Sequence, residues 1–187
     1  MKALKECFPE EDSLKKVIQL SMDGPAVNWR LLQLFKDVLA ELTDSKLLDI
    51  GTCGIHVVHG ALKSGFQASD WAIQRFIRSE FYVFRYSPAC RAAFILVTQS
   101  SSFPKPFVGV RWLENGPVVE HLLTILPHLK TFVDAVQNKT VKNVSLSNSY
   151  KIMANELKNM LLLRTKLEFF AVIVSELEPF MREFQTN

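Results

Sequence analysis

Apolar residues recur every three or four positions along most of this chain, and this spacing constrains its fold more than any other feature. The spacing holds from Ser69 to the last residues, and it is the period of an amphipathic α-helix with one face in a core. Pro88 and Pro117 stand where a helix favours proline, at its start. We therefore predict helices over residues 70–86, 89–97, 117–136, 149–163 and 166–184.

The first 65 residues follow a different pattern. Two short apolar runs, at 15–22 and 46–50, each end at turn residues and precede a helical pattern, at 28–42 and 53–65. Strand, helix, strand and helix with short connections predict a parallel βαβ unit. Two parallel strands leave edges and faces without partners, so we expect a complete version of the fold to supply more strands. The expected class is α/β but mostly α, with two parallel strands and flanking helices before an all-helical segment.

Composition excludes several classes of protein. The 187 residues carry 22 Lys and Arg against 19 Asp and Glu, and this net charge of +3 is too small to indicate nucleic-acid binding by itself. No apolar run approaches the roughly 18–20 residues of a membrane span, and no apolar signal region follows Met1. Cys7, Cys53 and Cys90 are too widely spaced for a disulfide framework. We expect an intracellular protein, nuclear or cytoplasmic, without a membrane partner.

Asp23 is the first candidate for chemistry. It lies at the carboxyl end of the first predicted strand, directly before Gly24 and Pro25, and ligands of α/β proteins collect at that edge of a sheet. A carboxylate there suits Mg²⁺, which prefers hard oxygen ligands. The alternative is an Asx turn, in which the Asp23 side chain only closes the turn.

Cys53, His56 and His59 form a second candidate site, because they follow one another at three-residue steps in the predicted helix 53–65. They spread over one broad side of that helix, where a shared zinc ion is conceivable, although no fourth ligand lies nearby in the sequence. Cys53 is also a candidate nucleophile with His56 as its base, since a helix N-terminus activates a thiol. The structural alternative is a buried cysteine beside a histidine that hydrogen-bonds the backbone.

Basic and aromatic residues are adjacent at four places, namely Trp29-Arg30, the run from Arg75 to Arg78, Arg85-Tyr86 and Arg111-Trp112. Such residues can bind nucleic acid by phosphate pairing and base stacking, provided that they gather on one face. In the commoner arrangement the rings face a core and the Arg side chains only reach the solvent. The sequence leaves both interpretations open.

Four short motifs, taken in order, resemble the transposases of hAT-type DNA transposons, especially their domesticated relatives associated with BED zinc fingers. The motifs are LSMDGPAVN at 20–28, CGIH at 53–56, RW at 111–112 and PFMREFQT at 179–186. They are spread over nearly the whole chain, and their order carries the resemblance.

The resemblance implies a partial ribonuclease H-like domain over residues 1–105 and a truncated, helical insertion-like segment over residues 106–187. Complete family members hold Mg²⁺ with an Asp-Asp-Glu set and cut DNA by in-line attack. In this comparison Asp23 is the remnant of the second acidic ligand, and Cys53 and His56 match the Cys-x-x-His beside it. These three residues are therefore the candidate metal ligands.

The same resemblance assigns Arg111 and Trp112 to the motif before the insertion, which makes them candidates for nucleic-acid contact. It places the first Asp before Met1 and the last Glu beyond Asn187. We therefore expect a truncated or domesticated transposase-derived protein that is catalytically incomplete and holds no cofactor as an isolated chain. Its expected partners are DNA, another protein, or a second copy bound through uncovered sheet edges.

Two other functions remain open at this stage. The first is a helical protein-interaction scaffold, in which the amphipathic helices recruit a partner chain. The second is a zinc-binding regulator that acts through Cys53, His56 and His59.

Overall fold

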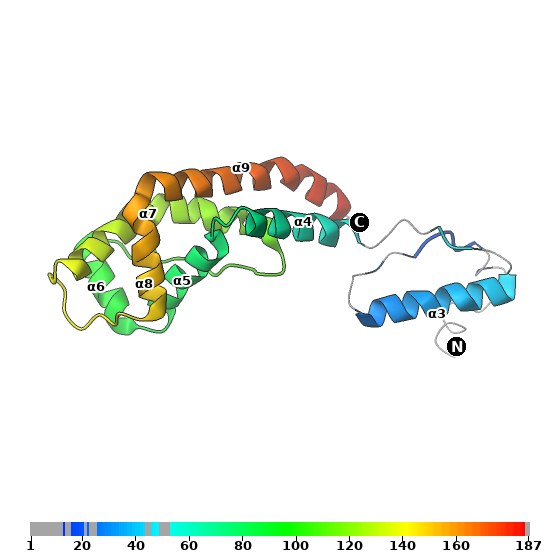
Figure 1. Cartoon of the computed structure of the whole chain (residues 1–187), viewed down its shortest axis with the longest axis horizontal. Coiled ribbons are helices and arrows are strands. Elements are labelled where there is room, and N and C mark those ends of the chain that lie inside the picture. Colours follow the sequence, from blue (N-terminus) through cyan, green and yellow to red (C-terminus); the bar gives the residue numbers. More distant parts are fainter. Residues whose placement is uncertain are drawn as a thin grey trace. The chain divides into compact units, whose positions relative to one another are not determined.

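The computed structural model describes residues 13, 16–20, 22, 26–43, 46–48 and 53–185. Every regular element in these described ranges is a helix (Figure 1). The chain forms two compact units, residues 1–58 and residues 59–187. Asp23 and the end of the second predicted strand lie outside the described residues.

The described part of the first unit is built on one amphipathic helix, α3 (Ala26–Thr43). Phe35 and Leu39 lie one turn apart on this helix, and both are buried. The residues that pack against them come from the segments before and after α3; they are Val17, Leu20 and Leu47. The part of this core that the structure describes is therefore small.

The prediction of two parallel strands, and with it the α/β ribonuclease H-like class, is wrong for the residues that the structure describes. Segments 16–20 and 46–48 contain no strand. Two backbone hydrogen bonds join this region, from Leu48 N to Ile18 O at 2.8 Å and from Cys53 N to Met22 O at 3.1 Å. Among the described residues no further extended segment is bonded to this pair, and a parallel pair needs more strands and two covered faces to form a regular ladder. Self-association through sheet edges therefore has no basis in this part of the chain.

The boundary between the units falls within α4 (Gly54–Ala68). The other elements of the second unit are α5 (Ile73–Arg85), α6 (Pro88–Thr98), η1 (Trp112–Asn115), α7 (Gly116–Gln137), α8 (Asn148–Glu156), η2 (Leu157–Asn159) and α9 (Met160–Gln185). α5 packs against α6 and α8, while α7 packs against α6 and α9. The predicted helical stretches are thus present, with some of their ends displaced.

The displaced helix ends have local causes. α5 begins at Ile73 instead of Asp70, because Asp70 and Ala72 have φ angles of 54° and 53°, which a right-handed helix does not include. Pro88 occupies the first turn of α6 as predicted, where Ser87 Oγ accepts a hydrogen bond from Cys90 N at 3.2 Å. The last helical stretch divides at η2 instead of near residue 165.

The core of the second unit is rich in aromatic rings. Phe84, Phe94 and Phe132 contact one another with ring centroids between 5.1 and 5.9 Å apart, which joins α5, α6 and α7. A second group centres on Trp112, whose ring contacts Phe66 of α4 and Phe170 of α9.

No helix within the described residues is long and apolar enough to cross a membrane.

Candidate nucleic-acid interface

α5 is strongly amphipathic, and its polar side carries the main candidate site of the second unit. Its inner side buries the apolar residues Ile73, Phe76, Ile77, Val83 and Phe84. Its outer side exposes a row of residues at three- and four-residue spacing, which places them on one face of the helix. We call this row the α5 face; it consists of Arg75, Arg78, Tyr82 and Arg85 of α5 together with Tyr86, which directly follows the helix.

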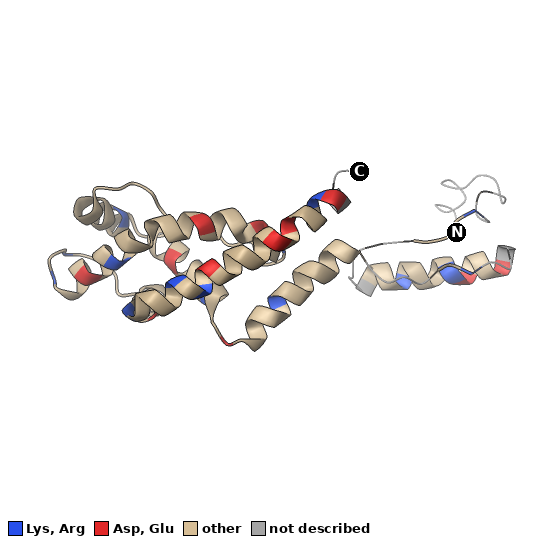
Figure 2. Cartoon of the chain, turned by 90° about the horizontal axis from the view of Figure 1, so that it is seen from above, with Lys and Arg blue, Asp and Glu red and all other residues tan. Residues whose placement is uncertain are grey.

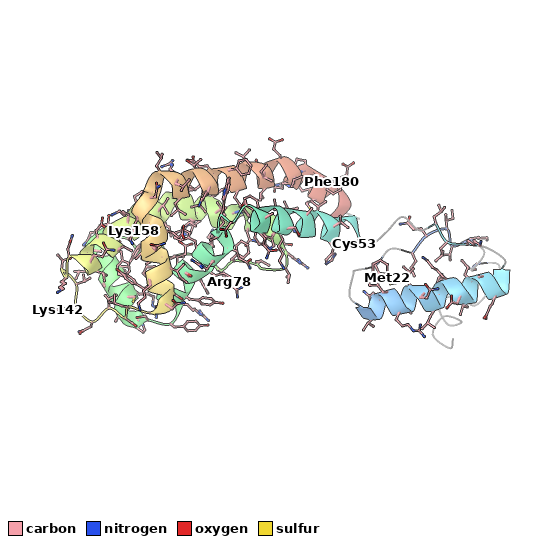
Figure 3. All side chains as sticks on the ribbon, in the orientation of Figure 1. Met22, Cys53, Arg78, Lys142, Lys158 and Phe180 are labelled. Carbon is pink, nitrogen blue, oxygen red and sulfur yellow. The ribbon has the colours of Figure 1, made fainter. Side chains whose placement is uncertain are left out.

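Two tyrosine rings of the α5 face are stacked. The ring centroids of Tyr82 and Tyr86 are 5.8 Å apart, and the ring planes differ by 16°. Tyr82 is 37% exposed and Tyr86 is 75% exposed, so ring surface remains open to solvent. Arg78 Nη2 donates a hydrogen bond to Tyr82 Oη at 3.5 Å, and the Arg78 side chain projects from α5 on the side away from α9 (Figure 3). Aromatic surface and positive charge therefore lie side by side.

Several exposed basic side chains elsewhere in this unit are neutralised by a carboxylate three or four residues away. These pairs are Arg111–Glu114, Lys130–Asp134, Arg164–Glu168 and Arg182–Glu178. Figure 2 shows Asp and Glu as red segments, several of them along the C-terminal half of α9. Pairs of this kind leave little net charge for an external ligand.

The α5 face differs, because none of its three arginines forms an ion pair with a described residue. The single acidic residue of α5, Glu80, is fully buried on the opposite side. Burial raises the pKa of the Glu80 carboxyl well above its usual value, which favours the neutral acid. The positive charge of the α5 face is therefore not cancelled by its own helix, and it would attract a polyanion.

A groove of about 410 Å³ runs between the α5 face and the start of α8. The α5 side of the groove contributes Gln74, Arg75, Arg78, Ser79 and Tyr82, and the α8 side contributes Asn148, Ser149 and Ile152. Ser147 caps α8, with its Oγ accepting a hydrogen bond from Tyr150 N at 3.2 Å. The groove thus combines guanidinium, amide and hydroxyl groups with one aromatic ring.

The structure places the predicted metal ligands as follows. Asp23 lies outside the described residues. A hydrogen bond from the His56 side chain lowers the pKa of the half-exposed Cys53 thiol. His59 is buried, and its Nδ1 accepts a hydrogen bond from Leu113 N at 3.2 Å. Within the described residues, no three His, Cys, Asp or Glu side chains are placed to share a metal ion.

Arg111 and Trp112 occupy different environments from the α5 face. Trp112 is only 2% exposed, and its Nε1–H donates a hydrogen bond to Gly109 O at 3.1 Å. Its ring is packed among core aromatic rings, so it offers no face on which a nucleobase could stack. Arg111 is exposed and bonds Glu114 at 3.0 Å. The structure therefore uses Trp112 as a core anchor.

The sequence indicates Arg75, Arg78, Arg85 and Tyr86 only as members of basic–aromatic neighbours, and Tyr82 is not among the residues predicted from it. The spacing of these residues could have shown that they share one face of a helix. The aromatic ring beside them in the sequence, Phe76, is buried in the core. No local signal could have shown that α8 begins opposite this face, because the two elements are more than 60 residues apart.

These features define, for the described part of the chain, an all-helical protein with a basic and aromatic groove on one helix pair. Comparisons with protein-family models, curated proteins and solved structures give no match to this chain. Only the residues of this chain therefore indicate its function.

Proposed function

We propose that this protein is a helical nucleic-acid-binding protein and that the α5 face is its contact surface. The observation that carries the proposal is that three arginines, which form no ion pair with any described residue, lie beside two stacked, exposed tyrosines on the α5 face. Arginine guanidinium groups bind phosphate oxygens in bidentate geometry, and tyrosine rings stack on bases. The α5 face offers both within one row of residues.

The small net charge of the whole chain does not oppose this function. Binding depends on the local potential where the ligand docks, and the α5 face keeps its charge whereas the pairs on η1, α7 and α9 do not. The resemblance to hAT-type transposases, which act on DNA, supports the same function. Descent from such a transposase remains a prediction that rests on the order of the four motifs.

The test measures binding of fluorescein-labelled DNA by anisotropy over a series of salt concentrations. The variant replaces Arg75, Arg78 and Arg85 with Gln. Each lost phosphate contact should reduce the slope of log Kobs against log salt by about 0.7–0.9. We therefore expect the triple variant to bind more weakly at low salt and to lose most of its salt dependence.

The matched control replaces Lys130, Arg164 and Arg182 with Gln, which removes the same charge from positions that are paired with carboxylates. This control should keep the affinity and the salt slope of the parent protein. Equal losses in both variants would show that only net charge matters, and that result would overturn the proposal. A separate variant, Arg111→Gln, tests the sequence-based prediction for Arg111.

A second candidate function is a protein-interaction scaffold, and the exposed apolar side of α9 favours it. Leu161, Leu162, Phe169 and Val172 are all at least 48% exposed on this helix. A pocket of about 510 Å³ between α4 and α9 adds apolar lining from Phe66 and Trp71. Exposed apolar surface of this kind favours association.

Light scattering tests this second candidate with a second copy of the chain as the partner. A dimer that dissociates in the Leu161→Lys, Val172→Lys double variant would support it. A monomer at all concentrations would argue against self-association through α9.

A further inference from the structure

We infer that the groove between α5 and α8 holds one unpaired nucleotide, so that the ligand of this protein is single-stranded nucleic acid. This inference rests on the proposed function and names the ligand of the same surface. The groove measures about 410 Å³, within the size range of pockets for small organic ligands, and it opens beside the tyrosine pair.

Two kinds of hydrogen-bond donor line the part of the groove that would hold the phosphate group of the nucleotide. Arg75 and Arg78 line it from α5, and the first turn of α8 lines it with Asn148 and Ser149. The first backbone N–H groups of a helix have no acceptor within that helix, and the helix dipole favours an anion there. The guanidinium groups and the start of α8 therefore line the same groove, and both would attract a phosphate group there.

Ser79 adds an independent observation at the same place. Its side chain belongs to the groove lining although the residue is only 5% exposed, and it makes no hydrogen bond to any described residue. The hydroxyl is not among the fully enclosed polar atoms, so it opens to the groove, where it can exchange a hydrogen bond with a ligand oxygen. The groove thus contains a polar group that lacks a partner within the protein's described residues.

The base would stack on the tyrosine pair. Tyr82 lines the groove, and Tyr86 extends its ring surface along the helix with the two planes 16° apart. Gln74 and Asn148 bring amide groups, which can donate to and accept from a base edge. A base in a duplex is already stacked and paired, so only an unpaired base can reach these rings.

The test measures binding of the 187-residue chain to three fluorescein-labelled ligands of about a dozen nucleotides: oligodeoxyuridylate, oligouridylate and a DNA hairpin duplex. We expect both single strands to bind more tightly than the duplex, and the tighter of the two identifies the sugar that the site prefers. Tyr82→Ala should weaken single-strand binding by roughly 5- to 100-fold and leave duplex binding almost unchanged. Tyr82→Phe keeps the ring and should bind like the parent protein.

A second pair of variants tests the start of α8. Asn148→Pro removes the side-chain amide and the first N–H of the helix, at a position where proline is tolerated, and Ser147 before it has the ψ of 164° that a residue before proline adopts. Asn148→Ala removes only the side-chain amide. We expect Asn148→Pro to weaken single-strand binding roughly tenfold more than Asn148→Ala does.

The outcomes separate this inference from the proposed function. If duplex and single strands bind equally well, or if Tyr82→Ala weakens both equally, the single-nucleotide groove is wrong while nucleic-acid binding by the α5 face stands. If no nucleic acid binds at low salt, the proposed function itself is wrong. Circular dichroism of each variant shows whether a loss of binding is due to a loss of helix.

Discussion

The backbone N–H of Leu113 donates a hydrogen bond to Nδ1 of His59 over 3.2 Å, which ties the turn η1 to α4 across 54 residues of sequence. Both residues are buried, so the N–H has no access to water. A histidine that was a candidate zinc ligand in the sequence therefore provides an acceptor for a core turn.

The first prediction concerns this hydrogen bond. His59→Leu keeps apolar bulk but removes the acceptor, so the Leu113 N–H would be buried without a partner. We expect the free energy of unfolding to fall by about 1–3 kcal/mol. His59→Asn is the matched control, because Asn Oδ1 can stand near the position of Nδ1. Urea unfolding followed by circular dichroism gives both values, and equal losses would contradict this role.

The second prediction concerns Asn115, whose side chain holds the loop before α7. Its Nδ2 donates to Val108 O, Arg111 O and Trp112 O at 3.0–3.1 Å, and its Oδ1 accepts from Val108 N at 2.7 Å. Asn115→Asp replaces the Nδ2 donor with an oxygen. The three hydrogen bonds that Nδ2 donates are then lost, and a carboxylate lies among carbonyl oxygens.

We expect Asn115→Asp to lower the free energy of unfolding by about 3 kcal/mol or more, because the residue is fully buried. The control is Asn155→Asp at an exposed position of α8, where the change should stay within about 0.5 kcal/mol. Urea denaturation of the two variants at neutral pH measures the difference. A small effect at Asn115 would mean that the loop holds its conformation without this side chain.

The third prediction concerns the pH dependence of stability. Glu80 is fully buried, and neither carboxyl oxygen has a hydrogen-bond partner within the described residues. Its pKa in the folded state is raised by burial, whereas an unfolded Glu titrates near about 4.3. Between these two values the folded state holds a proton that the unfolded state has lost. Stability should therefore decrease as the pH rises above about 4.3, until the folded-state pKa is passed.

Glu80→Met removes this ionisable group and keeps a similar volume. We expect it to flatten the pH dependence and to raise the free energy of unfolding at neutral pH by roughly 1–3 kcal/mol. Glu176→Met on the exposed side of α9 is the control and should leave the slope unchanged. Urea titrations at a series of pH values from 4 to 8 test this, and an unchanged slope in Glu80→Met would refute the assignment.

The fourth prediction concerns DNA cleavage and follows from the transposase resemblance. A two-metal site needs several carboxylates, and the resemblance identifies only Asp23. Incubation of the purified protein with Mg²⁺ or Mn²⁺ and labelled transposon-end DNA should therefore give no nicks, as resolved on a denaturing gel. Nicking that disappears in the Asp23→Ala variant would contradict the expected inactivity.

The sequence alone determined where most helices of the second unit lie. Amphipathic spacing is a local property, because residues three and four positions apart share a helix face wherever the helix packs. Pro88 therefore predicts the start of α6, and the apolar spacing predicts α7, without knowledge of the fold. The same spacing also contained the α5 face, since Arg78, Tyr82 and Tyr86 follow one another at four-residue steps.

Short apolar runs say less about the secondary structure that a segment adopts. The runs around Ile18 and Leu48 have the length and composition of strands, but a strand exists only when a neighbour pairs with it along its length. Adjacent residues in a motif were also ambiguous. Arg111 and Trp112 are consecutive, yet the first faces solvent and the second lies in the core.

Only the tertiary structure decided which side chains meet. His59 reaches Leu113, and α8 begins opposite Arg75 and Arg78, because packing of the aromatic core brings together elements that are distant in sequence. Such contacts depend on the shapes and volumes of many side chains at once, whereas periodicity reports only the apolar side of each helix. The sequence therefore determined the helices and their faces, and the packing of those helices determined the groove.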